Sequence, residues 1–126
     1  MPTRTTRDVA ERLVALCRAN DARTALAELY HPDAVSVEAM PAPGMDSAEV
    51  RGIDAIGAKH DWWEGAMEVH SAIADGPYLH GDDRFGVIFE VDATERATAR
   101  RHAMKELGIY TVRDGQVVRE EFFYTM

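Results

Sequence analysis

The stretch Val112-Arg-Asp-Gly-Gln-Val-Val-Arg-Glu-Glu-Phe-Phe-Tyr124 contains the clearest turn signal in the sequence, followed by residues that favour strands. Asp114 and Gly115 both tolerate the positive φ that a tight hairpin turn demands. The residues on either side therefore predict two long antiparallel strands that meet at this turn, over 97–112 and 117–125.

Two further strands are expected before this hairpin, over 69–79 and 85–94. Turn signals at Gly76-Pro77 and Gly81-Asp82-Asp83 separate the strands of this half of the chain. In the second of these strands one apolar face alternates with a more polar one, and the apolar face consists of Phe85, Val87, Phe89 and Val91.

The first third of the sequence predicts two helices. Apolar residues recur at helical spacing over 9–17, and Thr5 followed by Asp8 is typical of a capping box at the start of a helix. Asp21 can cap a second helix. Pro32 then ends that helix, because proline cannot donate the next helical hydrogen bond.

A strand and a third helix follow. Alternation over 34–40 predicts a strand with Ser36 and Glu38 on one side, and the prolines and glycine of 41–47 predict a mobile flap. A third helix is expected to open near Gly52, because one stripe repeats at intervals of three and four. This stripe consists of Ile53, Ile56, His60, Trp63 and Met67. Helices first and strands afterwards predict an α+β fold, with the helices on one side of an antiparallel sheet.

The totals limit the possible functions. The chain has 126 residues, 46% of them apolar, which is enough for one core, so 1–126 is interpreted as a single domain. A net charge of −8 repels a phosphate backbone, so nucleic acid is not expected as a partner. Neither 1–6 nor any later segment predicts a signal peptide or a membrane span, so we expect a cytoplasmic protein without a membrane partner. Cys17 is alone and is expected to be a small buried side chain.

No cofactor or metal is expected either. Gly108 and Gly115 lie in or next to predicted strands, so no glycine loop precedes a helix where it could cradle a phosphate. His70 and His102 could face each other across strands, together with Glu90. The spacing of these three residues fits no compact metal-ligand motif.

The order of the elements, with Leu29-Tyr-His-Pro-Asp-Ala-Val35, Arg51-Gly-Ile-Asp-Ala-Ile56 and the final hairpin, resembles the nuclear-transport-factor-2-like superfamily. More narrowly it is similar to the SnoaL-like branch, which includes polyketide cyclases and stands near the ketosteroid isomerases. The resemblance covers essentially the whole chain. It implies a cone-shaped half-barrel, in which three helices of the N-terminal half and a curved antiparallel sheet enclose a pocket. It also implies a homodimer through the outer sheet face.

The resemblance also assigns positions. Glu38 falls where ketosteroid isomerases place their carboxylate general base. Their oxyanion-binding tyrosine would fall at Val14, and their protonated carboxylic acid near Gly108, so both donors are absent. Stabilisation of an enolate, often the largest catalytic term, would then have to come from other residues.

The same comparison predicts that even-numbered positions of the last two strands face the cavity. These positions are Met104, Glu106, Tyr110, Glu120, Phe122 and Tyr124. Leu107, Ile109 and Phe123 would then lie on the outer face, where an apolar surface suits subunit pairing. If this parity holds, three glutamates (Glu38, Glu106 and Glu120) approach one partly apolar space, where burial and repulsion raise carboxyl pKa values. Alternatively, Glu106 pairs with Lys105 or Arg119 at a rim and Glu120 is solvated.

His60 interrupts an apolar helical stripe and has two interpretations. It could carry a proton or donate to a ligand oxygen, or it could be a core imidazole bonded to a carboxylate such as Asp61. Aromatic and methionine side chains would supply a wall suited to a flat or apolar ligand. The candidate ligand-binding residues are Tyr30, Met40, Trp63, Met104, Tyr110, Phe122 and Tyr124.

Two functions therefore remain open. The first is a cofactor-independent isomerase, cyclase or dehydratase that moves a proton on a small hydrophobic or aromatic molecule. Glu38 would act as the base, and His60, Glu106 or Glu120 as the proton donor. The second is a non-catalytic ligand-binding or dimeric assembly module with a vestigial pocket, which the missing donors at Val14 and Gly108 favour.

Overall fold

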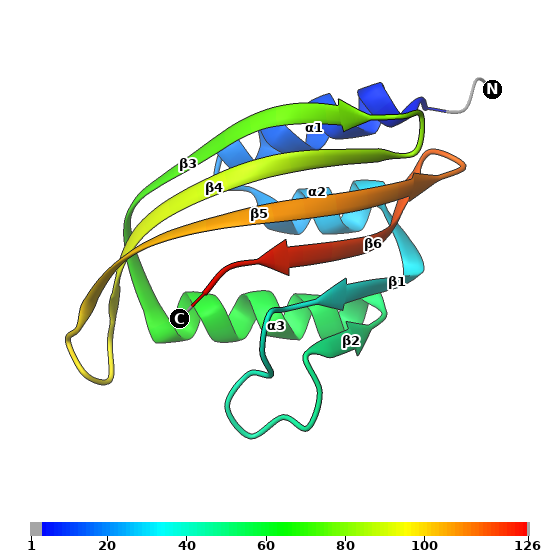
Figure 1. Cartoon of the computed structure of the whole chain (residues 1–126). Helices are drawn as coiled ribbons and strands as arrows, with labels where there is room; N and C mark the ends of the chain where they lie inside the picture. Colours follow the sequence, from blue (N-terminus) through cyan, green and yellow to red (C-terminus); the bar gives the residue numbers. More distant parts are fainter. Residues whose placement is uncertain (1–3, 126) are drawn as a thin grey trace.

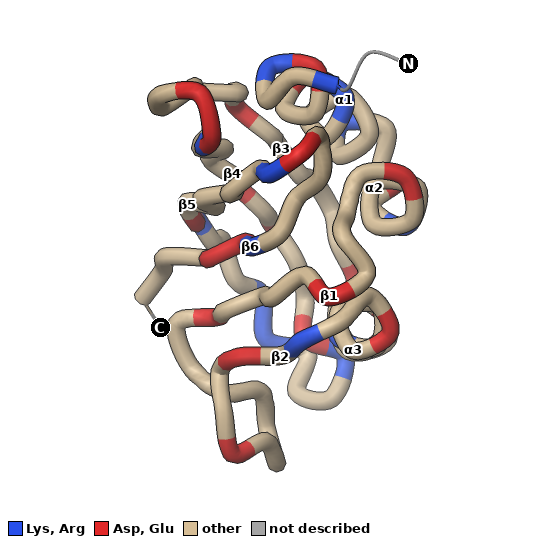
Figure 2. The backbone as a smooth tube through the Cα atoms, turned by 90° about the vertical axis from the view of Figure 1, so that its right-hand side faces the viewer, with Lys and Arg blue, Asp and Glu red and all other residues tan. Residues whose placement is uncertain are grey.

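In the part of the chain that the structure describes, residues 4–125, six strands form one curved, unclosed sheet and three helices cover one face of it (Figure 1). The structure is a computed structural model. Its elements are α1 (Thr6–Arg18), α2 (Ala22–Leu29), β1 (Tyr30–Val37), β2 (Glu49–Arg51), α3 (Ile53–Ala66), β3 (Met67–His80), β4 (Arg84–Glu95), β5 (Arg101–Arg113) and β6 (Gln116–Phe123). Figure 2 shows the helices together on one side of the sheet, which is the expected α+β arrangement.

The helix boundaries follow the predicted caps. The Thr5 hydroxyl accepts the Asp8 N–H and the Asp8 carboxylate accepts the Thr5 N–H, which confirms the capping box of α1. The Asp21 carboxylate accepts a backbone N–H in the first turn of α2. That helix ends one residue before Tyr30, and so ahead of Pro32.

The register of β4, β5 and β6 confirms the predicted orientation of the last strands. Tyr110 of β5 lies opposite Phe85 of β4 and Glu120 of β6, and all three side chains are buried on the inner face. On the outer face, Leu107 and Phe123 are 38% and 52% exposed. The inner face of these three strands therefore faces the helices, and the outer face points away from them.

The pairing of β1 with β6 differs from the expected antiparallel arrangement. These two strands run parallel, with Ser36 opposite Glu120 and Val37 opposite Glu121, whereas the other pairings in residues 4–125 are antiparallel. β1 also begins four residues earlier than expected, at Tyr30. Its other edge, away from β6, pairs with β2, a strand that was not predicted. Parallel neighbours need a long crossover connection, and the chain from α3 to β5 supplies it here.

The third helix begins directly after Gly52, as expected. The φ of Gly52 is +93°, a conformation that glycine adopts without strain. The helix ends at Ala66, so Met67, which is expected on its stripe, is the first residue of β3. Residues 38–48 contain neither helix nor strand, and their mobility stays a prediction.

The core lies between the helices and the concave sheet face. Leu13 of α1, Leu29 of α2, Ile56 of α3 and Phe85 of β4 are each at most 1% exposed. Among the helices described, none is long and apolar enough to pass through a membrane. Residues 1–3, which belong to the segment in which no signal peptide is expected, lie outside the described part, as does residue 126.

Candidate functional site

Four ionisable side chains from different elements meet beside the parallel pair of strands. Glu38 directly follows β1, Lys59 lies on α3, and Glu106 and Glu120 belong to β5 and β6. Lys59 Nζ lies 2.9 Å from Glu38 Oε1, and these side chains are only 17% and 23% exposed. The charges of the other three groups all affect the pKa of Glu106. The structure thus brings together the three glutamates that the strand parity predicted.

Glu120 is the most deeply buried of these groups, with 1% exposure. The Tyr30 hydroxyl donates to Glu120 Oε1, and Ser36 Oγ donates to Glu120 Oε2 over 3.0 Å. Lys59 Nζ in turn donates to Ser36 Oγ. A continuous polar chain therefore runs from Tyr30 through Glu120, Ser36 and Lys59 to Glu38. The alternative that Glu120 is solvated is therefore wrong.

Burial shifts the acidity of two of these carboxyl groups. Burial, with the charges of Glu38 and Glu120, raises the pKa of Glu106 from 4.5 to about 7, against the opposing charge of Lys59. Burial also raises the pKa of Glu120, although its hydrogen bonds and Lys59 oppose that shift. A carboxyl group with a pKa near 7 can both give and take a proton at neutral pH.

The rim pairing considered for Glu106 is not formed. Lys105 Nζ lies 3.8 Å from Glu90, and Arg119 Nε lies 2.9 Å from Glu121. Lys105 and Glu90 are exposed, whereas Glu106 is half-buried on the inner face. Glu106 therefore sits among carboxyl groups and apolar side chains, which is the origin of its raised pKa.

Aromatic rings form an apolar wall beside the carboxyl groups. Tyr110 stacks on Phe85 with 4.9 Å between ring centres and 8° between planes, and it meets Phe122 edge-on at 6.2 Å. Gly108 leaves room for these rings, because a Cβ at this position would lie 3.0 Å from the Tyr110 ring and 3.2 Å from the Phe122 ring. Lys59 Nζ lies 5.5 Å from the centre of the Phe122 ring, a distance typical of a cation–π contact.

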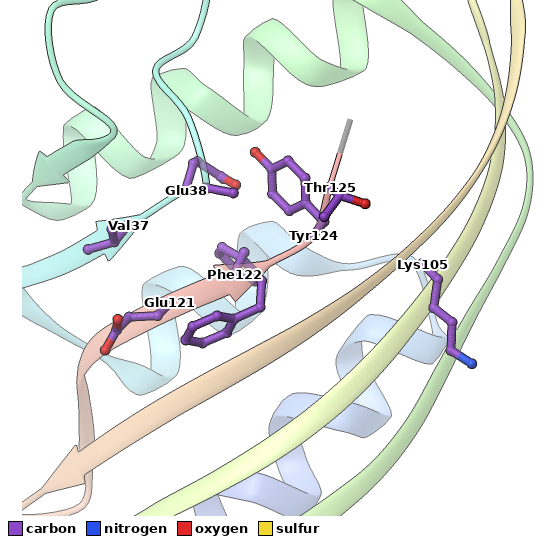
Figure 3. A pocket seen from close by; sticks show the side chains of 9 residues that line it. Val37, Glu38, Lys105, Glu121, Phe122, Tyr124 and Thr125 are labelled. Carbon is purple, nitrogen blue, oxygen red and sulfur yellow. The ribbon is translucent and has the colours of Figure 1, made fainter.

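A hollow of about 580 Å³ opens where β1 and β6 end (Figure 3). Three of the predicted site residues, Glu38, Phe122 and Tyr124, line it. Burial raises the pKa of Tyr124 to about 12, and the negative charge of Glu38 acts in the same direction. The hollow is also lined by Val37, Ala39, Lys105, Glu121, Phe123 and Thr125.

The other predicted ligand-binding residues do not line this hollow. Tyr30 and Tyr110 are part of the buried core. Trp63 on α3 and Met104 on β5 are half-buried, and Met40, just beyond β1, is 42% exposed. The hollow therefore holds only part of the predicted set.

Comparison with known proteins connects this geometry to a family. A family model for SnoaL-like domains matches residues 4–124. The chain belongs to the SnoaL-like domain family. Among solved structures, a protein of Mesorhizobium loti that is provisionally named a SnoaL-like polyketide cyclase is 35% identical, with a TM-score of 0.88. That match covers 96% of this chain and 100% of the other.

More distant structures share the fold of this SnoaL-like domain. The protein RV0760c of Mycobacterium tuberculosis, solved with estradiol-17β-hemisuccinate, is 15% identical with a TM-score of 0.72, and the match covers 94% of this chain and 92% of that one. A protein of Xanthomonas campestris with a cystatin-like fold is 18% identical with a TM-score of 0.73, covering 98% and 92%. A search of curated proteins found no match.

In this SnoaL-like domain, the expected hydrogen bond between His60 and Asp61 is not formed, and the role of His60 as a proton carrier or donor stays a prediction. Its Nδ1 is buried without a hydrogen-bond partner among the described residues. Asp61, the carboxylate expected to bond it, lies 2.6 Å from Arg23 instead. Burial lowers the pKa of His60, and the positive charge of Lys59 adds to that effect. The imidazole is therefore favoured in its neutral form.

The histidines considered for a metal site have other neighbours. His70 Nε2 lies 2.6 Å from Thr94 Oγ1. His102 Nε2 lies 3.8 Å from Glu95, and the nearby Glu90 faces Lys105. These contacts do not bring His70, His102 and Glu90 together as one ligand set.

Two members of the polar chain were not singled out from the sequence, Lys59 and Ser36. Ser36 lies on the same side of the predicted strand as Glu38, so the alternation contained that signal. Lys59 stands three residues after Ile56 and four before Trp63, which places it on the same helical stripe. His60, its neighbour, drew attention instead because histidine titrates near neutrality.

Glu106 is expected to make stability fall as pH rises. Its pKa is about 7 when folded and 4.5 ordinarily, so between these values the native state binds more protons than the unfolded state. The free energy of unfolding should therefore decrease from pH 4.5 to 8. Glu106→Gln should remove up to about 3 kcal/mol of this decrease, measured by urea denaturation across this pH range.

The exposed Glu68 of β3 offers the matched control. Glu68→Gln removes a carboxyl group without changing a buried one, and its stability should follow that of the wild-type protein at each pH. If Glu106→Gln also followed the wild type, the pKa of Glu106 would not be raised in the folded state.

Proposed function

We propose that this SnoaL-like domain binds a small, largely apolar organic molecule and transfers a proton between two of its atoms without a cofactor. The observation that carries the proposal is that two carboxyl groups of the same site, Glu38 and Glu106, have different surroundings. Glu38 is ion-paired with Lys59, whereas Glu106 has a pKa of about 7 in a half-buried position. Such differences between neighbouring carboxyl groups are the usual basis of acid and base roles at one site.

The proposed roles follow from these surroundings. Glu38 lines the hollow and takes a proton from the substrate as the base. Glu106 is about half protonated at neutral pH and returns a proton at a second position of the substrate. Glu120 is enclosed by Tyr30 and Ser36, which favours a supporting role for it. His60, in its neutral form, is a further candidate donor at the helix side.

A flat or hydrophobic ligand fits the walls of the hollow. Phe122 and Tyr124 present aromatic surface there. Trp63, Met104 and Met40 lie on neighbouring elements and would extend the contact to a larger ligand. RV0760c, which shares this fold, was solved with a steroid ester, and we propose a ligand of comparable flatness for this domain.

One observation favours a ligand-binding domain without chemistry as the second candidate. By the resemblance, the oxyanion donors of ketosteroid isomerases would fall at Val14 and near Gly108. Val14 is 1% exposed within the core, and rings close over Gly108. Binding without proton transfer is what this alternative predicts.

Deuterium exchange at carbon distinguishes the two candidates. The purified protein is incubated in D₂O with a panel of cyclic ketones, enones and β-keto esters, and loss of C–H signals is followed by proton NMR. Exchange above the buffer rate that disappears in Glu38→Gln supports proton transfer. Saturation-transfer signals from bound compounds without any exchange would support the non-catalytic alternative.

We also propose a homodimer that forms through the outer sheet face. Apolar side chains exposed there by β3, β5 and β6 include Ile73, Tyr78, Leu107 and Phe123, the last 52% exposed. Burying such a patch is favourable by about 25 cal/mol per Å². Phe123→Arg should therefore convert a dimer into a monomer in sedimentation-velocity experiments at about 10 μM, roughly a concentration at which weak dimers dissociate.

The exposed Trp62 of α3 lies away from this face and provides the control. Trp62→Arg places the same charge on a helix and should leave the sedimentation coefficient unchanged. A wild-type protein that sediments as a monomer at millimolar concentration would remove the dimer proposal.

A further inference from the structure

The ammonium group of Lys59 has more donors than the protein uses. A lysine ammonium carries three N–H donors. Nζ lies within hydrogen-bond distance of Ser36 Oγ and Glu38 Oε1, and 5.5 Å from the centre of the Phe122 ring. Lys59 itself does not line the hollow, but its neighbours Glu38 and Phe122 do. A ligand oxygen held against Glu38 would therefore lie next to the third N–H of Lys59.

We propose that Lys59 is the cationic donor that stabilises the oxyanion formed when a carbonyl substrate loses the proton next to its carbonyl group. The inference rests on the proposed proton transfer and names the residue that stabilises its charge. It also supplies the stabilising group that the positions Val14 and Gly108 do not provide.

Proton transfer would exchange the partners of Lys59 without changing the total charge. At the start, the ammonium faces the Glu38 carboxylate at 2.9 Å. When Glu38 takes the proton, the C–H electron pair forms a C=C bond and the carbonyl π pair moves to oxygen. Glu38 is then neutral and the enolate oxygen is negative, so the ammonium keeps one anionic partner throughout. Such a preorganised charge stabilises the transition state because no solvent must reorganise.

The second half of the reaction balances in the same way. The enolate electron pair forms a new C–H bond with the proton of the Glu106 carboxyl group, and the C=O bond is restored. Glu38 holds the proton taken first and Glu106 is left as a carboxylate, so one proton must pass between these groups or through water before the next cycle. In this proposal water carries that proton between the two carboxyl groups.

Several contacts hold Lys59 in position for this role. Ser36, which accepts from Nζ, is itself fixed by its hydrogen bond to the buried Glu120. Tyr30 fixes the other oxygen of Glu120. The side chain of Lys59 is 17% exposed, so its charge acts in a site with little water and is weakened less by solvent than a surface charge would be.

Ionisation of a bound phenol tests the proposal without turnover. A phenolate oxygen resembles an enolate oxygen, and 2-naphthol is flat and apolar. Its ionisation is followed by absorbance during a pH titration with the protein in excess. Lys59→Met keeps most of the side-chain length but removes the charge, so bound 2-naphthol should ionise about 1 to 2 pH units higher in this variant than in the wild type.

Two further variants make the result specific. Arg7→Met removes one exposed positive charge from α1 and should leave the titration of bound 2-naphthol as in the wild type. Lys59→Arg keeps the charge and should restore most of the difference. If Lys59→Met titrated bound 2-naphthol like the wild type, or if the wild type bound no phenol at all, the proposal would be overturned.

The proposal and the proposed function can fail separately. If Glu38→Gln left exchange unchanged while Lys59 still lowered the ionisation pH of 2-naphthol, the proton-transfer role would fail and an anion-stabilising lysine would remain. If Glu38→Gln abolished exchange but Lys59→Met left both exchange and phenol ionisation unchanged, the role of Lys59 would fail alone.

Discussion

Replacing Glu38 with glutamine is expected to slow the exchange of an enolisable substrate by roughly 10²- to 10⁴-fold, the range typical of general-base catalysis. The amide has the size of the carboxylate but cannot accept the proton. Its oxygen can still face Lys59, so the 2.9 Å contact has a substitute and the fold should persist. The measurement is the initial rate of C–H signal loss in D₂O, compared at equal protein concentration.

A carboxylate on a neighbouring strand gives the matched comparison. Glu49 of β2 is exposed and lies 3.9 Å from Arg119, outside the hollow. Glu49→Gln should exchange substrate protons at the wild-type rate. A Glu38→Gln protein as active as Glu49→Gln would mean that another group takes the proton.

Truncation of Phe85 to alanine is expected to cost about 3 to 5 kcal/mol of unfolding free energy, the range found for buried aromatic residues. The side chain is fully buried and stacks on Tyr110 at 4.9 Å. Its loss would leave a cavity and remove the support of the ring that contacts Phe122. Urea denaturation at pH 7 measures the change through the midpoint and the slope.

Trp62→Ala serves as the control for the loss of an aromatic ring. Trp62 is 50% exposed on α3, and an exposed substitution usually changes stability by less than about 1 kcal/mol. A small loss for Phe85→Ala, similar to that of Trp62→Ala, would contradict the central place of this ring in the core.

The inner face of the last two strands was predictable from the family resemblance together with strand alternation. Strand alternation has a period of two, so one correct anchor assigns every side chain of a strand to a face. The Asp114-Gly115 turn marked the hairpin, and Tyr110 and Glu120, which the parity assigns to the inner face, are buried there. The helix starts were likewise predictable, because the cap residue and its backbone partner are close in sequence.

Pairings between distant segments were not predictable in this way. No turn signal joins β1 to β6, so their parallel register, with Ser36 opposite Glu120, has no local signature. The role of Lys59 depends on that pairing together with the position of α3. A single lysine within a helix is most often a solvated side chain, and only tertiary structure distinguishes it from one that is nearly enclosed.

The parallel pairing of β1 with β6 also affects when the protein can fold during its synthesis. Ser36 and Glu120 are hydrogen-bonded although 84 positions separate them along the chain. Contacts of such long sequence separation form late in folding, because loop closure must come first. During translation, the ribosome has to release β6 before Ser36 and Tyr30 can meet their acidic partner. Until then, a nascent polypeptide has the base and the lysine but not the buried carboxyl group that supports them.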